Sequence, residues 1–352
     1  MDRTDENDGL ARFRMRRITG QETGFPLAEA GVLLRRVTLA MLIWIPGTFA
    51  SQLVAQQGYS DREALIGLKL SSQPGEIPVY YSACCRDRAL KVQAELEDGL
   101  RFYKEKLGIH LDLVAAVLDK NDWTRALEHR PNGNSPPYGM TNVPYGVAFI
   151  PADDNGVITQ GLLADKIHES AETRRMLKSV HLSYDEAARR FMMHPVLHEL
   201  GHKLVYEYGI GPPTQEGSWW VDEMLASYFA YAYEKSRRPE TATIVEAMTN
   251  LSSEDLKYTS LDDFPKTVPL LMAGDSSNMT WYQRQFEARL ASVYAKEGLD
   301  FLPRVKETFP AGAKDDLSPA EVLAKLELIC PGFQAWAVQM ANVKAGGKAG
   351  SH

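Results

Sequence analysis

Residues 194–209 read HPVLHELGHKLVYEYG, and the interpretation of the whole chain turns on this stretch. It contains an HExxH motif formed by His198, Glu199 and His202. On a helix, positions four apart share one face, so the two imidazoles can bind a single metal ion with Glu199 beside them. The stretch therefore predicts a helix that carries a metal site.

The flanking residues support a helix. Pro195 suits its first turn, and Gly209 is typical of a helix end. Upstream, Ser183 and Glu186 have the spacing of a capping box, which predicts the start of a preceding helix. His194 lies one turn before the motif, but Pro195 disturbs the geometry between them. We therefore expect His194 at the helix start or on the surface, not among the ligands.

A catalytic zinc ion usually has three protein ligands and one open position for water. The Gly and His that would continue the motif in metzincins are replaced by Val205 and Tyr208. The next acidic candidates in an apolar stretch are Asp222 and Glu223, and twenty residues separate His202 from Glu223. That spacing allows a return on an antiparallel helix, so Glu223 is the expected third ligand. Asp222 is an alternative ligand, but a hydrogen bond from it to a ligand is the favoured reading.

An HExxH motif followed after twenty residues by the helix WWVDEMLASY resembles the gluzincin metallopeptidases. This group includes thermolysin, aminopeptidases of the leukotriene A hydrolase type and peptidase MA-like proteins. The resemblance covers residues 77–340 and is most specific around the motif. It implies that His198, His202 and Glu223 bind one zinc ion per chain, and that Glu199 is the general base.

Two departures from the aminopeptidase branch limit the resemblance. That branch has a GxMxN substrate motif shortly before the zinc helix, whereas residues 139–142 have a different spacing and lie too far upstream, so exopeptidase activity is not expected. It also uses a tyrosine about sixty residues after the zinc Glu to stabilise the oxyanion. This implies the same role for Tyr282, 59 residues after Glu223, although Gln283 and Gln285 depart from the pattern. The alternative for Tyr282 is an aromatic residue of the core.

The chain before the motif alternates short β-like runs with helices. Ile77–Ser82, Ile109–Leu118 and Gly146–Ile150 are typical of strands, and Arg86–Lys106 of an amphipathic helix. Gly146–Ile150 is either an edge strand along which a peptide pairs or an ordinary core strand. No strand is predicted after about residue 161.

The predicted fold class is α+β, with a strand-containing N-terminal lobe (77–160) packed on a helical C-terminal lobe (161–342). The resemblance makes this fold zincin-like, with the active-site helix at the lobe junction. The two lobes form one metallopeptidase domain, 56–342. Residues 1–55 are an N-terminal extension with a signal peptide, and residues 343–352 are a flexible tail.

The N-terminal extension has the pattern of a secretory signal. Arg35 and Arg36 precede the apolar run VTLAMLIWIPGTFA at 37–50, which is shorter than the roughly 20 residues that span a bilayer. Pro46 and Gly47 break this run, and small residues follow at Ala50, Ser51 and Ala55, as in signal peptides. We therefore expect a secreted, periplasmic or cell-envelope protein, which contacts a membrane only through this segment if it stays uncleaved.

Composition narrows the class of protein further. The net charge of the 352 residues is −7 and the pI is about 5.7, which argues against a nucleic-acid partner. Only three cysteines are present, too few for a disulfide-built scaffold. A bridge from Cys330 to either Cys84 or Cys85 and three buried free thiols fit the sequence equally well.

These patterns predict a zinc-dependent peptidase whose substrates are peptides or proteins. The zinc ion lowers the pKa of a bound water and polarises the scissile carbonyl, and Glu199 takes the proton of that water. The alternative is a non-catalytic, zinc-bound binding or scaffold protein that keeps the gluzincin fold. Glu199 favours the enzyme, because a structural metal site does not need a base.

Overall fold

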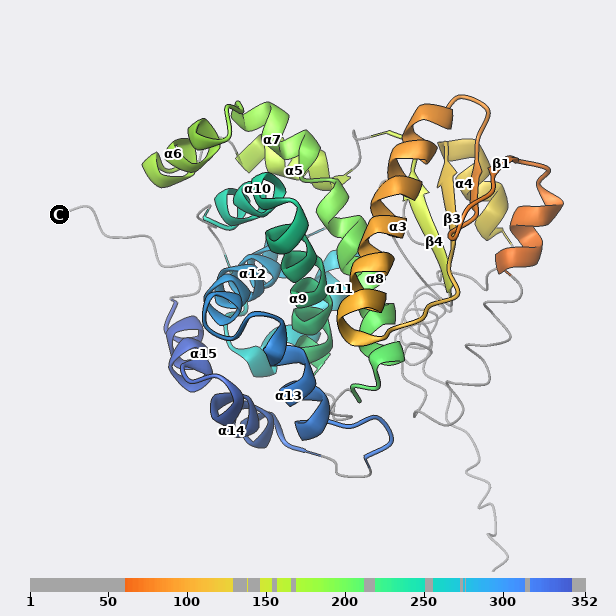
Figure 1. The fold of residues 1–352 in the computed structure, drawn as a ribbon. Helices are drawn as coiled ribbons and strands as arrows, with labels where there is room; N and C mark the ends of the chain where they lie inside the picture. The colour runs from red at the N-terminus through yellow and green to blue at the C-terminus, as the bar shows by residue number, and fades with distance from the viewer. Residues whose placement is uncertain are drawn as a thin grey trace, which may run out of the picture. The chain divides into compact units, whose positions relative to one another are not determined.

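The computed structural model describes residues 61–128, 138, 146–153, 157–165, 169–211, 219–250, 256–272, 275, 277–313 and 317–343. They belong to one compact unit, residues 51–352. This part of the chain is mixed α and β, mostly helical, with one four-stranded sheet, which confirms the predicted α+β class (Figure 1). The predicted signal peptide and nearly all of the predicted tail lie outside the described residues.

A helical segment at 61–67 precedes the named elements. The strands are β1 (Ser71–Gln73), β2 (Val79–Tyr81), β3 (Val114–Leu118) and β4 (Val147–Pro151). The helices of the N-terminal half are α3 (Arg86–Leu107), α4 (Lys120–Leu127), α5 (Val157–Ala164), α6 (Ala171–Ser179) and α7 (Tyr184–Arg190). The later helices are α8 (Met193–Tyr208), α9 (Trp219–Arg237), α10 (Pro239–Thr249), η4 (Leu261–Lys266), α11 (Thr267–Met272), α12 (Ser277–Glu297), η5 (Gly298–Asp300), α13 (Phe301–Thr308), α14 (Pro319–Ile329) and α15 (Phe333–Ala341).

The sheet has the strand order β1-β2-β3-β4. β1 is antiparallel to β2, whereas β2, β3 and β4 are parallel to one another. The register aligns Val79 with Ala115 and Ala115 with Ala148. Parallel neighbours need crossover connections. α3 lies on the connection from β2 to β3, and α4 lies on the connection from β3 to β4.

β3 and β4 are buried along their whole length. Alternate residues of a strand point to opposite faces, and here the two sets belong to different apolar clusters. The odd-numbered residues of β3, such as Val117, join the cluster that contains Leu96 of α3. The even-numbered residues, such as Ala116, join the cluster that contains Trp123 of α4. α3 and α4 therefore cover opposite faces of the sheet, which explains why these strands are apolar throughout.

The helical half is built around α9, which packs against both α8 and α12 (Figure 1). α9 is buried on nearly all sides from Trp220 to Glu234, as expected for a helix that is apolar all round. The cluster that contains α3 and one face of the sheet extends into these three helices. The core is therefore continuous from the sheet to the helices, with members such as Val117, Leu96, Leu200, Phe229 and Phe286.

Most of the predicted elements are confirmed. Ile77–Ser82 contains β2, Arg86–Lys106 corresponds to α3, and Gly146–Ile150 corresponds to β4. The predicted strand Ile109–Leu118 is correct only from Val114 onward. Val114 is the first residue of β3 that is paired with β4, so residues before it have no strand partner. After residue 161 the described residues contain no strand, as predicted, apart from one isolated bridge.

The predicted capping box is present at the start of α7. Ser183 Oγ accepts a hydrogen bond from the Glu186 main-chain N–H at 3.3 Å, and the Glu186 carboxylate accepts one from the Ser183 N–H at 3.0 Å. α7 begins at the next residue, Tyr184. Two orphan donors of the helix N-terminus are thereby satisfied.

The cysteines match neither arrangement expected from the sequence. Cys84 and Cys85 form a disulfide with each other, and Cys330 is a buried free thiol. Cys85 is the N-cap of α3, whereas Cys330 is the C-cap of α14. The carbonyl oxygen of Cys330 accepts a hydrogen bond from Arg289 of α12. The disulfide therefore lies at the start of α3 and the free thiol at the end of α14.

Among the described residues, no helix has both the length and the apolar character needed to cross a bilayer. The apolar run at 37–50 lies outside those residues.

Candidate metal centre

α8 and α9 run antiparallel, and the polar residues of their facing sides meet. His198 lies opposite Ser227 and His202 lies opposite Glu223, so rising numbers on α8 meet falling numbers on α9. α8 ends at Gly209, whose φ of 84° lies in the left-handed region that glycine adopts without steric cost. This is the antiparallel return that the twenty-residue spacing predicts.

Gly201 marks a very close approach of the two helices. A Cβ added at this position would lie 2.2 Å from the carbonyl oxygen of Ala226 and 2.8 Å from its Cα. Real Cβ atoms essentially never show contacts below 3.0 Å, and both of these atoms are main chain. Any side chain at this residue would therefore push α8 away from α9. The glycine inside HELGH lets the histidines on either side reach across to α9.

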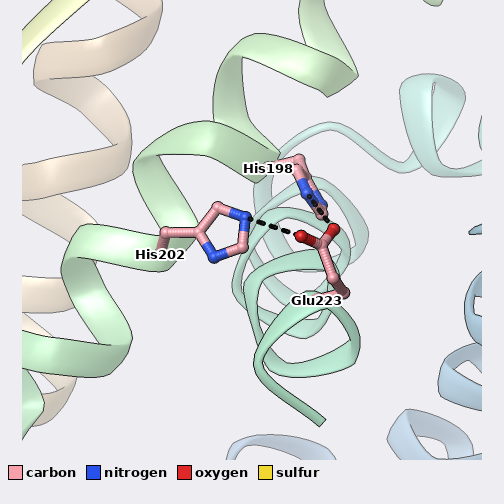
Figure 2. A group of neighbouring side chains, drawn as sticks. All are labelled: His198, His202 and Glu223. Atoms are coloured by element: carbon pink, nitrogen blue, oxygen red, sulfur yellow. Dashed lines mark ion pairs between the residues drawn. The ribbon is translucent and has the colours of Figure 1, made fainter. Parts of the chain in front are cut away.

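The two histidines of the motif and Glu223 form a group that could hold a metal ion, called the metal-binding group below (Figure 2). One ligand atom from each of the three residues lies within 4.8 Å of the other two. His198 Nε2 is 3.3 Å from Glu223 Oε2, and His202 Nε2 is 3.8 Å from Glu223 Oε1. Figure 2 shows both imidazoles directed from α8 toward the carboxylate on α9. All three side chains are largely buried, with 12, 23 and 12% of their surface exposed.

This donor set fits a zinc ion. Zinc binds His nitrogen and carboxylate oxygen at about 2.0–2.2 Å, so tetrahedral ligand atoms lie about 3.3–3.5 Å apart. The Nε2–Oε separations of 3.3 and 3.8 Å are close to that range. Two imidazoles and one carboxylate also match the ligand set of catalytic zinc, which leaves a fourth position for water or substrate.

Hydrogen bonds to the outer nitrogens orient the two imidazoles. His198 Nδ1 lies 2.9 Å from Ser227 Oγ, and His202 Nδ1 lies 2.9 Å from Asp222 Oδ2. With Nδ1 engaged in this way, Nε2 of each ring faces Glu223. Asp222 thus occupies the favoured position, bonded to a ligand, and Glu223 is the carboxylate that joins the metal-binding group.

Without a metal ion, the protonated imidazole of His202 attracts the carboxylates of Asp222 and Glu223. Burial disfavours the charged form of His202, but the carboxylates of Asp222 and Glu223 outweigh burial and raise the pKa of His202 to about 10. Burial also disfavours the charged form of Glu223, but the hydrogen bond with His198 and the charge of His202 lower its pKa to about 2. A metal ion that binds here must therefore displace a proton from His202.

Glu199 lies between the two histidines on α8, and its side chain is half-buried. Its charge is one of those that raise the pKa of His202, so the carboxylate lies within electrostatic reach of the metal-binding group. This is the position at which an HExxH helix carries its general base.

Tyr282 does not join this group. Its hydroxyl donates a hydrogen bond to the main-chain carbonyl of Ser260, and its ring packs edge-on against Phe264 and Trp281. The residue is fully buried, and burial raises the pKa of the phenol. These contacts favour the alternative for Tyr282, an aromatic residue of the core, and give no support to the predicted oxyanion role.

The next residue on α12 reaches the site instead. Gln283 Nε2 donates a hydrogen bond to Glu223 Oε2 at 2.7 Å, so α12 becomes the third helix that contributes to the site. The sequence marks Gln283 only as a departure from the aminopeptidase pattern. Consecutive helical residues point about 100° apart, so a shift of one residue changes which side chain faces the metal-binding group.

The sequence predicts His194 at the helix start or on the surface, and the surface part of this prediction is wrong. His194 lies in the first turn of α8, but only 4% of it is exposed. Its two ring nitrogens contact Glu234 and Glu287. These partners lie 40 and 93 residues away along the chain, so no local pattern could indicate them.

Gly201→Ala should separate α8 from α9. We expect it to lower the free energy of unfolding by about 1–3 kcal/mol, the usual cost of overpacking, and to weaken metal binding. Denaturant unfolding and a chelator competition measure the two effects. Gly161→Ala is the matched control, because a Cβ on this helical glycine of α5 meets nothing within 4 Å and should stabilise the protein slightly. Equal behaviour of the two variants would show that the close approach is unimportant.

Gln283→Leu should weaken metal binding, because it removes the donor that holds Glu223 in place. Partners of metal ligands typically contribute 10–100-fold to affinity, so we expect at least a tenfold rise in the dissociation constant. Gln285→Leu is the control, since Gln285 is a half-buried residue of the same helix. An unchanged affinity in Gln283→Leu would mean that Glu223 is positioned without it.

Comparisons with models of protein families, with curated proteins and with solved structures find no match to this chain. What the metal-binding group does must therefore be inferred from the side chains that form it.

Proposed function

We propose that the protein is a zinc-dependent peptidase of the gluzincin type that hydrolyses peptides or proteins. One observation carries this proposal. The two histidines of an HExxH helix and a glutamate from the next helix direct ligand atoms to one point, within 4.8 Å of one another. A buried pair of histidines with no metal role would not need a third, acidic ligand and hydrogen-bonded outer nitrogens on both rings.

Bound at this group, a zinc ion supplies Lewis-acid polarisation of a carbonyl and lowers the pKa of a coordinated water. His198, His202 and Glu223 hold the ion, and Ser227 and Asp222 keep the imidazoles turned toward it. The chain itself supplies the proton transfers.

Glu199 accepts a proton from the attacking water and returns it to the leaving amine. No covalent intermediate with the protein is required, because water is the nucleophile. A non-catalytic zinc site would need the ligands and their hydrogen-bond partners, but it would not need a carboxylate at this position. The presence of Glu199 therefore favours a peptidase over a non-catalytic zinc-bound scaffold protein.

The finer architecture belongs to the same proposal. A zincin-like fold would make residues 77–160 the sheet-containing lobe and residues 161–342 the helical lobe, with α8 at their junction. The continuous core supports an arrangement in which α8 contacts both the sheet side and the helices. The signal-like sequence at 37–50 makes secretion, the periplasm or the cell envelope the proposed location.

Purified protein from zinc-replete cells should contain one zinc ion per chain. His198→Ala and His202→Ala should each remove most of it, because two ligands and a water hold zinc weakly. Metal analysis by mass spectrometry, with circular dichroism to confirm folding, measures this. Wild-type protein without stoichiometric metal would end the peptidase proposal.

Glu199→Gln should keep the zinc and the fold but lose hydrolysis, because the amide keeps the size of the side chain and not its basicity. We expect peptide cleavage to fall by at least ~10²-fold, the usual contribution of a general base. Digestion of a peptide library at equal zinc occupancy gives the comparison. If the wild type binds zinc but cleaves no peptide, and the variant behaves in the same way, the non-catalytic scaffold explains the protein better than a peptidase does.

A further inference from the structure

A second polar layer lies beside the metal-binding group. In this layer, His194 Nδ1 is 2.9 Å from Glu234 Oε2, and His194 Nε2 is 2.8 Å from Glu287 Oε1. The three side chains come from α8, α9 and α12, and at most 7% of any of them is exposed. We call His194, Glu234 and Glu287 the anionic layer.

The anionic layer belongs to the same three helices as the metal site. His194 precedes His198 by four residues on α8, and Glu287 follows Gln283 by four residues on α12. Residues four apart on a helix are neighbours, with Cβ atoms about 5–6 Å apart. The anionic layer therefore lies about one helical turn from the group that would hold a cation.

The two hydrogen bonds of this layer account for two protons. Each of the two N···O contacts contains one proton, since an ionised carboxylate can only accept and a bare ring nitrogen can only accept. The proton can sit on nitrogen or on oxygen, but two protons shared by an imidazole and two carboxylates leave a net charge of −1 in either case. Burial disfavours the charged imidazole, but Glu234 and Glu287 outweigh burial and raise the pKa of His194, so these protons are retained.

Two oxygens of this layer, Glu234 Oε1 and Glu287 Oε2, are buried and have no hydrogen-bond partner among the described residues. Burial raises the pKa of Glu234, the direction expected for a carboxylate whose ionised form is poorly compensated. A net negative charge that stays buried destabilises the folded protein. A cation one turn away would reduce this destabilisation, because opposite charges in a buried site attract one another over such distances.

We infer that the anionic layer is a built-in counter-charge for the divalent cation of the metal centre. Its negative charge strengthens metal binding and destabilises the metal-free protein. This inference rests on the proposed metal site, but it makes a separate claim. A layer that only ties three helices together would stabilise the protein with and without metal.

Glu287→Gln is the test, because the amide oxygen still accepts a hydrogen bond from His194 while the negative charge is removed. We expect the zinc dissociation constant, measured by competition with a chromophoric chelator, to rise about tenfold. The metal-free variant should melt at the same temperature as metal-free wild type or higher. Glu240→Gln is the charge-matched control, since 54% of its side chain is exposed, and it should change neither quantity.

The outcomes separate this inference from the proposed function. A wild type that binds no zinc removes both. A wild type that binds zinc, with unchanged affinity in Glu287→Gln, overturns the counter-charge alone, and so does a variant that loses metal-free stability. If Glu287→Gln does not fold, Glu234→Gln gives the same comparison. If neither variant folds, the inference is also overturned, because a counter-charge for the metal ion is not needed for the metal-free protein to fold.

Discussion

The candidate metal centre depends on how closely α8 can approach α9. Main-chain atoms of Ala226 occupy the space that a side chain at residue 201 would need. At this separation, ligand atoms of two imidazoles on one helix and of a carboxylate on the other lie within 4.8 Å of one another, close enough to share one ion. The approach is a constraint on shape, not on chemistry. It shows why a glycine stands between two ligands in a helix, where glycine is otherwise unfavourable by about 0.5–1 kcal/mol relative to alanine.

That close contact places ionisable groups inside an apolar helical core, where they need partners. His198 and His202 form hydrogen bonds through their outer nitrogens with Ser227 and Asp222. Glu223 accepts a hydrogen bond from Gln283. In the anionic layer, each carboxylate keeps one oxygen that has no hydrogen-bond partner in the described part of the chain. Buried polar groups whose hydrogen bonds are all made fix the geometry of a site. Buried polar groups that lack a hydrogen-bond partner indicate that a further charged group, such as a bound ion, balances their charge.

The sequence predicted what depends on local spacing and missed what depends on tertiary contact. HExxH and the later glutamate follow from helical periodicity and chain reversal, so His198, His202 and Glu223 could be selected without coordinates. The resemblance implies that Tyr282 reaches the site, but the packing of Phe286 and Tyr282 against η4 sets the rotation of α12 and brings Gln283 to Glu223 instead. The sequence could not indicate Glu234 and Glu287 as partners of His194 either, because tertiary packing brings them together. The short polar strand β1 was also missed, because Ser71–Gln73 lacks the apolar alternation that indicates a strand.

The sheet contributes to the site through α3, although no strand residue belongs to the metal-binding group. α3 covers one face of β2 and β3, and its Gly99 lies under Leu197 and Leu200 of α8. The hydroxyl of Tyr103 donates to the main-chain carbonyl of Phe229, which ties α3 to α9 as well. Both helices that carry ligands are therefore fastened to the same element, and that element is fixed by strands buried on both faces. A ligand group supported in this way is positioned by the core as a whole, so its geometry does not depend on the metal ion alone.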